Sequence, residues 1–139
     1  MNSTALPIPA ELRLLQQQRD DAALQLDRHK DLLARLNDIQ RARARGNGRM
    51  EVPVDLGMGF MAEGVVEDTA RVIVAAGVDD LFLDLPIERA GQFVEKRIAV
   101  LEKKQQSLKA PIARLTEEHA SLAQTLQKAL HSQAGAPAS

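Results

Sequence analysis

The sequence predicts an α+β fold: a long antiparallel coiled-coil helical hairpin with two β-hairpins at its connecting end. Helix-forming segments rich in Leu, Gln, Glu, Lys and Arg lie on both sides of the centre, whereas the centre itself holds four strand-like runs joined by Gly-bearing turns. The chain also has only three Phe and neither Trp nor Tyr, and a coiled coil does not require aromatic bulk in its core. The strand-like runs are Met50–Leu56, Phe60–Val65, Arg71–Ala76 and Leu81–Leu85.

The first helix is expected over residues 9–45, after a disordered segment of residues 1–8. Pro9 suits a first helical turn, where its missing N–H costs nothing, and Gly46-Asn47-Gly48 is a stop signal. The apolar seam of this helix includes Leu12, Leu15, Ala22, Leu26, Leu33 and Leu36. Residues 9–132 are therefore expected to form a single domain that opens with this helix.

The second helix is expected over residues 86–132, followed by a disordered tail of residues 133–139. Its seam positions alternate in steps of four and three from Val94 to Ala129, which is the heptad pattern of a coiled coil. Pro111 interrupts the pattern, and proline inside a helix costs about 3 kcal/mol. Because the heptad stays in phase beyond it, we expect a kink near Ser107–Pro111 and not a full stop.

The central strands show a period-two pattern, in which Val52, Val54 and Leu56 alternate with Glu51, Pro53 and Asp55. Short hairpins are marginal alone and leave unpaired edges, so the pattern predicts a subunit that is completed by other chains. The predicted subunit-interface residues are Val52, Val54, Phe60, Val72, Val74, Leu81 and Leu83. On this hypothesis, Val74→Asp leaves the chain helical but unable to join its partners.

Apolar residues also gather at the two outer helix ends. If the helices pair antiparallel, the N-terminal leucines face the C-terminal ones and form an apolar tip away from the strands. Ordinary seam packing accounts for such a tip, and the alternative is a client-binding surface, since exposed apolar surface is a contact site or a liability. The predicted tip residues are Leu12, Leu15, Leu122, Leu126 and Leu130.

Composition narrows the classes of function. Lys+Arg total 18 against 19 Asp+Glu, for a net charge of -1, so we expect neither direct nucleic-acid binding nor a membrane partner. The absence of Cys removes thiol nucleophiles, disulfides and Cys-ligated zinc. No apolar run approaches the ~20 residues of a membrane span, and the N-terminus does not resemble a signal peptide.

No catalytic, cofactor or metal site is predicted. Gly57-Met58-Gly59 has the wrong spacing for a nucleotide-binding loop and suits a hairpin turn. His29 and His119 fall on helix seams, where polar residues set register, and a metal role would need a second ligand one turn away. The basic run Arg41–Arg45 is interpreted as cations at a helix C-terminus, with a nuclear-import or nucleic-acid patch as the alternative.

The central segment resembles the α-class prefoldin subunits. The resemblance rests on Val54-Asp55-Leu56-Gly57, on residues 65–77 (VVEDTARVIVAAG) and on Leu81-Phe82-Leu83-Asp84-Leu85 followed by Glu88, Ala90 and Phe93. It covers about residues 32–108. The sequence departs from the family pattern at the longer turn Val78-Asp79-Asp80, at Pro86, where a Thr cap is usual, and at Pro111.

This resemblance implies a heterohexamer of two α-class and four β-class subunits, whose hairpins form a β-barrel with projecting coiled coils. Such complexes hold unfolded proteins, notably actin and tubulin, and pass them to the cytosolic chaperonin without ATP. The resemblance is strongest to subunits of a prefoldin-like complex that associates with the R2TP co-chaperone, in the cytoplasm and nucleus. Those subunits are also reported as transcriptional cofactors, so an adaptor acting outside the hexamer is the alternative. An enzyme has no supporting feature.

Overall fold

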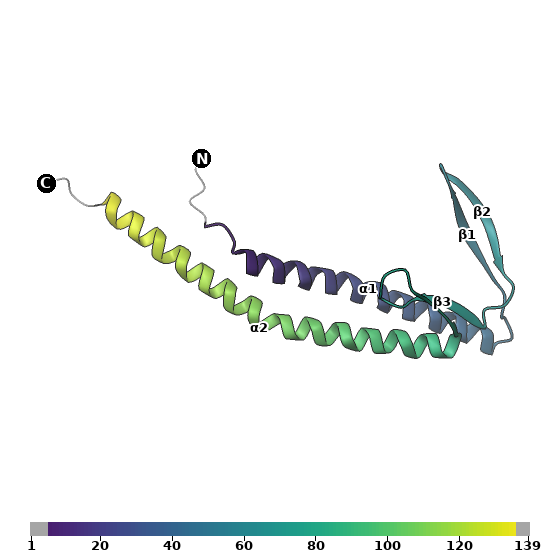
Figure 1. Ribbon diagram of the computed structural model, residues 1–139. Helices are drawn as coiled ribbons and strands as arrows, with labels where there is room; N and C mark the ends of the chain where they lie inside the picture. Colours follow the sequence, from purple (N-terminus) through teal and green to yellow (C-terminus); the bar gives the residue numbers. More distant parts are fainter. Residues whose placement is uncertain (1–5, 136–139) are drawn as a thin grey trace. The chain divides into compact units, whose positions relative to one another are not determined.

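The computed structural model describes residues 6–135 (Figure 1). The elements in chain order are α1 (Ala10–Ala44), β1 (Met50–Gly57), β2 (Phe60–Val66), β3 (Arg71–Ala75), β4 (Phe82–Pro86) and α2 (Ile87–Ala134). The predicted α+β class, with two helices and two antiparallel hairpins, is confirmed. The chain divides into two compact units: residues 26–100 form one, and the residues before 26 and after 100 form the other.

The element bounds differ from the expected ones by a few residues. α1 ends one residue earlier than expected, and α2 extends two residues further, so Gln133 and Ala134 are helical and not part of a disordered tail. α2 is continuous through Pro111, so the proline does not stop the helix. The remaining segments expected to be disordered lie largely outside the described residues.

A glycine cap ends α1. Gly46 adopts φ +86°, and its N–H donates to the carbonyl oxygen of Arg43, while the N–H of Asn47 donates to that of Ala42 at 2.9 Å. This pair of bonds is the Schellman motif, which satisfies carbonyls at the end of a helix and needs a residue with positive φ. The stop signal in the sequence thus corresponds to a defined local structure.

The β1–β2 hairpin has little cover within the chain. Its strands pair antiparallel, with Val54 opposite Ala62 and Asp55 opposite Met61, and the register shifts between Asp55 and Gly57. The turn places Gly57, Met58 and Gly59 at positive φ, and the Asp55 carboxylate accepts a hydrogen bond from the N–H of Gly57 at 2.8 Å. None of residues 50–66 is fully buried.

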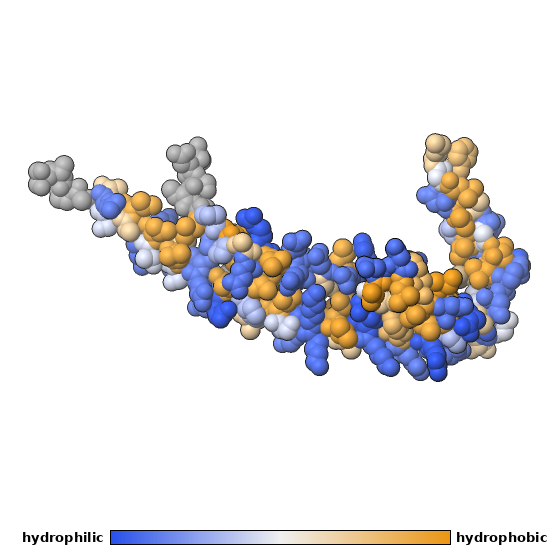
Figure 2. Space-filling model, in the orientation of Figure 1, coloured by the Kyte–Doolittle hydropathy of each residue, from blue (hydrophilic) through white to orange (hydrophobic). Residues whose placement is uncertain are grey.

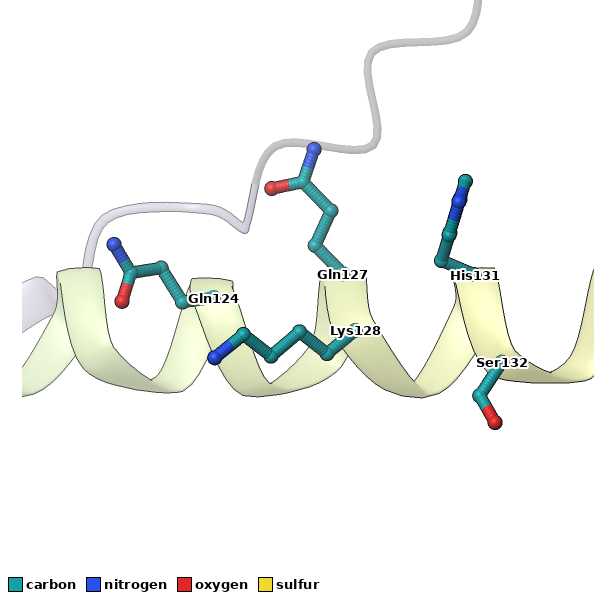
Figure 3. Close-up of a pocket in the computed structure, with 5 residues that line it drawn as sticks. All are labelled: Gln124, Gln127, Lys128, His131 and Ser132. Carbon is teal, nitrogen blue, oxygen red and sulfur yellow. The ribbon is translucent and has the colours of Figure 1, made fainter.

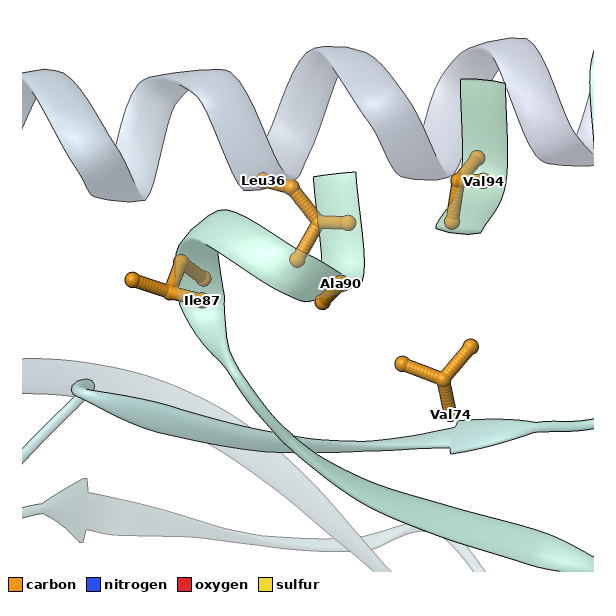
Figure 4. Packing of buried hydrophobic residues seen from close by; sticks show 5 residues of the cluster. All are labelled: Leu36, Val74, Ile87, Ala90 and Val94. Carbon is orange, nitrogen blue, oxygen red and sulfur yellow. The ribbon is translucent and has the colours of Figure 1, made fainter. Parts of the chain in front are cut away.

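The β3–β4 hairpin, in contrast, contributes to the core of the unit of residues 26–100. Val72 lies opposite Leu85 and Val74 opposite Leu83, so these four side chains share one face of the hairpin. Figure 4 shows Val74 pointing from its strand toward the helices. The buried members of this cluster are Leu36, Val74, Ile87, Ala90 and Val94.

The second unit contains a smaller core between the two helices. Leu12 packs with Leu108 and Ile112, and Leu15 and Leu115 lie against them. Since Leu12 is already in the first turn of α1, no earlier turn of α1 remains to cover the end of α2, which continues to Ala134.

Candidate subunit interface

Exposed apolar side chains concentrate on the central strands and their turns. Within residues 6–135, more than half of the large exposed hydrophobic residues lie between Val54 and Phe82, and Figure 2 shows the hydrophobic colour spread over the β1–β2 hairpin. Met58 at the hairpin turn is 99% exposed. Contiguous apolar surface of this kind marks contact sites on soluble proteins.

The strands also have free hydrogen-bonding edges. Each of the two sheets has only two strands, β1–β2 and β3–β4, so within residues 6–135 every strand has one edge without a neighbouring strand. Such an edge presents a row of N–H and C=O groups that can pair with another chain. The exposed apolar residues and the free edges therefore occupy the same hairpins.

The structure divides the seven predicted interface residues into two groups. Val54, Phe60 and Leu81 are exposed and Val52 is half-buried, so their side chains remain accessible. Val72, Val74 and Leu83 instead occupy the face of the β3–β4 hairpin that bears Val74, which is only 7% exposed.

The prediction that partner subunits bury Val74 is therefore wrong, because this chain's own helices cover it. The same correction applies to Val72 and Leu83, because strand alternation places their side chains on the inner face with Val74 and not on a surface open to partners. The outer face of this hairpin carries Ile73 and Phe82, which are 74% and 61% exposed. The sequence reasoning missed both residues, although the alternation in the strand contained the signal: Ile73 lies between two inward-facing valines.

A polar junction holds the strands to the helix ends. Thr69, which is 4% exposed, donates its hydroxyl to the carbonyl oxygen of Gly48 at 3.1 Å, and its N–H donates to the same oxygen at 2.9 Å. Arg43 at the end of α1 donates to the Asp68 carboxylate at 2.8 Å, and the N–H of Ile87 donates to the carbonyl oxygen of Ala70 at 2.8 Å. Residues 68–70 thus connect both hairpins to both helices.

These contacts change the acidity of Asp68. The hydrogen bond from the N–H of Ala70, followed by that from Arg43, lowers the pKa of the Asp68 carboxyl below its ordinary value of 3.8. Hydrogen bonds that favour the ionised form have this effect. The junction therefore favours a charged Asp68 at neutral pH.

The predicted tip residues are not brought together. Leu12 is buried in the smaller core and Leu15 is half-buried there, so neither forms an exposed tip. Leu122, Leu126 and Leu130 are 56%, 41% and 52% exposed on the overhang of α2, a term used here for residues 120–134. Their expected pairing with Leu12 and Leu15 is wrong because Leu12 packs against Leu108 and Ile112, earlier in α2.

Within residues 6–135, the other polar side chains do not gather into a metal-binding site. The Nε2 atom of His119 lies 3.3 Å from the carbonyl oxygen of Leu6, and within residues 6–135 no group of three potential ligands is arranged to hold a metal ion. Among the described residues, five side chains of α2 line a hollow near the end of that helix (Figure 3). No helix within the described residues is both long and apolar enough to span a membrane.

The basic run near the end of α1 is partly engaged in ion pairs. Arg41 lies 3.7 Å from Asp38, Arg43 is held by Asp68, and Arg49 lies 3.9 Å from Glu67. These contacts agree with cations that serve the helix end and the junction.

Comparison with known proteins identifies the family to which the chain belongs. The family model described as Prefoldin subunit matches residues 8–132, which is most of the chain. The chain therefore belongs to the prefoldin family, and the resemblance of the central segment is confirmed.

Within that family, the chain is similar to UXT (ubiquitously expressed transcript protein), as the resemblance predicts. It is 32% identical to Protein UXT of Homo sapiens over 98 residues, which cover 70% of this chain and 60% of the relative. For Protein UXT of Bos taurus the identity is 31% over 91 residues, with 66% and 56% covered. The chain thus spans less than two thirds of the length of these relatives. A chain of filamentous PFD from Methanocaldococcus jannaschii, solved by cryo-EM, aligns with a TM-score of 0.49 and 23% identity, covering 79% of this chain and 93% of that one.

Proposed function

We propose that this chain is a non-enzymatic subunit of a prefoldin or prefoldin-like, R2TP-associated co-chaperone complex. Its hairpins join other α- and β-class prefoldin-type subunits, and the complex holds unfolded or partly assembled client proteins in the cytoplasm and nucleus. Clients then pass to the cytosolic chaperonin or to R2TP components. The observation that carries this proposal is the presence of free strand edges and exposed apolar residues on the same hairpins of a prefoldin-family chain.

The physical argument for assembly is the cost of leaving these hairpins uncovered. Phe60 and Phe82 are 69% and 61% exposed, and fully burying one such side chain is worth about 1.5–3 kcal/mol. Pairing of a strand edge adds a ladder of hydrogen bonds to this gain. A neighbouring subunit that covers both features therefore stabilises the hairpins.

Native mass spectrometry of the complex purified from its own cells tests the assembly. We expect a hetero-oligomer that contains other prefoldin-type subunits. A stable monomer, or a complex without any such subunit, would contradict the proposal. The presence of R2TP components would distinguish the prefoldin-like complex from a prefoldin that serves actin and tubulin.

The overhang of α2 is the proposed client contact. Leu122, Leu126 and Leu130 lie four residues apart and therefore on one face of the helix, and all three are exposed. We expect Leu122→Ser/Leu126→Ser/Leu130→Ser to leave assembly unchanged and to weaken the suppression of aggregation of a denatured client. The matched control is Gln124→Ser/Gln127→Ser, at exposed positions of the same turns. Equal suppression by both variants would place the client contact elsewhere.

A further inference from the structure

The four strand edges of the chain are not equally open to a partner. β1 carries Pro53 in its interior, and proline on an edge strand interrupts pairing because it has no N–H to donate. β4 ends at Pro86, and its central Asp84 is paired with Arg71 across the hairpin at 3.1 Å. β3 has no proline, but its Arg71 is the other member of that ion pair. β2 has neither a proline nor a cross-strand ion pair, so its outer edge is the most open of the four.

β2 has one charged residue, and it lies at the centre of the strand. The strand runs from Phe60 to Val66, and Glu63 is its middle residue. Glu63 is exposed and lies on the face of the hairpin that also bears Glu51 and Asp55. Residues 50–66 include these three carboxylates and no Lys, Arg or His, so no cation within the hairpin offsets the charge of Glu63.

The central position has a consequence for pairing between two copies of this chain. If β2 paired antiparallel with β2 of a second copy over its whole length, Phe60 would lie opposite Val66, Ala62 opposite Gly64, and Glu63 opposite the same residue of the other copy. Every other pair in that arrangement is apolar. Like charges directly opposite each other across strands are destabilising, so Glu63 acts against the one register that would otherwise suit self-pairing.

We propose that the outer edge of β2 selects a strand of a different polypeptide that carries Lys or Arg opposite Glu63 and apolar side chains on either side. This partner class rests on the proposed function, because it is a neighbouring subunit of the same assembly. Opposite charge at one cross-strand position stabilises the pairing that self-association destabilises. The single carboxylate therefore both disfavours homo-oligomers and favours a hetero-oligomer.

A mixing experiment tests the charge rule directly. Wild-type chain and Glu63→Lys chain, with different tags, are mixed at equal concentration and the paired species are counted by native mass spectrometry. Random pairing alone gives twice as many mixed pairs as either homotypic pair, and we expect the mixed pairs to exceed this statistical ratio by roughly a further twofold to tenfold, the range available from one cross-strand charge pair. The excess should shrink at high ionic strength, because the Debye length falls from about 10 Å at 0.1 M to 3 Å at 1 M salt.

Two further variants separate position from net charge. Glu51→Lys makes the same charge change on the same face of the hairpin, but on the proline-bearing strand, and should give no comparable excess. Glu63→Gln removes the repulsion and should strengthen self-pairing by roughly twofold to fivefold. Equal behaviour of Glu51→Lys and Glu63→Lys, or mixtures that stay monomeric at every accessible concentration, would overturn the inference.

Co-purification of the complex from cells tests the charge rule independently of the mixing experiment. If wild-type chain co-purifies with prefoldin-type subunits and Glu63→Lys does so equally well, the charge rule fails while the proposed function stands. If the wild type co-purifies with no such subunit, the proposed function fails, and the mixing result still decides whether Glu63 controls the edge of β2.

Discussion

At the scale of single residues, two contacts show how the strands are fixed to the helices. In the turn between β3 and β4, the guanidinium group of Arg97 lies against Gly77, and its buried Nε–H has no acceptor within the described residues. At the junction, Asp68 and Thr69 receive and donate the hydrogen bonds that join the hairpins to the end of α1. The contact at Gly77 depends on the space left for the Arg97 guanidinium group, whereas the contact at Asp68 depends on the charge of its carboxylate.

Gly77→Ala should destabilise the chain by about 1–3 kcal/mol, the cost of a strained backbone conformation. Gly77 adopts φ +83°, and an added Cβ atom would lie 2.8 Å from the Nη2 atom of Arg97. Gly91→Ala is the matched control: it lies within α2 with no atom near the added methyl group, so it should stabilise by about 0.5–1 kcal/mol. Urea unfolding of both variants measures the difference, and an unaffected Gly77→Ala would contradict the account of the turn.

The junction should make stability depend on acid pH. Because the pKa of Asp68 is lowered in the folded chain, the unfolded chain binds its proton first as the pH falls. The stabilising contribution of Asp68 is therefore fully present above the ordinary pKa of 3.8 that the unfolded chain retains, and it is lost as the pH falls through the lower folded value.

Asp68→Asn removes this titrating group while an amide oxygen remains as a hydrogen-bond acceptor. We expect the variant to be less stable than the wild type at neutral pH and to lose less stability between about pH 5 and pH 3, the range around the ordinary carboxyl pKa. Urea midpoints measured across that range compare the two chains. Parallel curves would show that the junction does not depend on the charge of Asp68.

At the scale of elements, the two hairpins have different relations to the helices. The β3–β4 hairpin packs one face into the core of its unit, whereas the β1–β2 hairpin buries none of its residues. The first hairpin is therefore stabilised by contacts within this chain, whereas the second has little cover of its own and would gain stability from a partner in the proposed assembly. α2 shows a similar contrast between its covered seam and its exposed overhang.

Neighbouring residues on β3 provide a test of this difference. Val74→Asp should cost roughly 3–5 kcal/mol of folding free energy, because it places an unpaired charge in the core. Ile73→Asp, at a position 74% exposed, should change the stability of the isolated chain by no more than about 0.5 kcal/mol. Thermal unfolding measures both effects. If Val74→Asp folded normally and failed only in assembly, the original interface assignment of Val74 would be restored.

At the scale of the whole molecule, free strand edges and exposed apolar residues occur together on the central segment of the chain. Neither sheet is extended beyond two strands within the described residues, and exposed apolar residues gather on the same hairpins. Protein edges of this kind are normally covered or protected. The isolated chain is therefore expected to self-associate weakly through these hairpins, with Glu63 limiting the pairing of β2.

Hydrogen exchange should report the covering of these edges. In the isolated chain, outward-facing amides of residues 60–66 should exchange rapidly, because edge strands have solvent-exposed backbone groups. In the purified complex the same amides should become protected, while amides in the middle of α1 should change little. Exchange that stays rapid in the complex would show that partners do not pair with β2.

The local structure of this protein was largely predictable from its sequence. Gly46 ended the first helix because only a residue tolerant of positive φ completes its cap, and the period-two runs located the four strands. The heptad seam stays in phase beyond Pro111, and this predicted that the proline would not end α2. These features depend on neighbours a few residues apart, so the sequence contains the information directly.

Tertiary structure decided which surfaces are covered. The sequence could not show that Val74 packs on this chain's own helices, because an apolar strand face looks the same whether its cover is intramolecular or not. It also could not fix the offset between the helices, which leaves Leu122 exposed and Leu12 buried. Both outcomes depend on contacts between residues far apart in the chain, and local patterns do not specify such contacts.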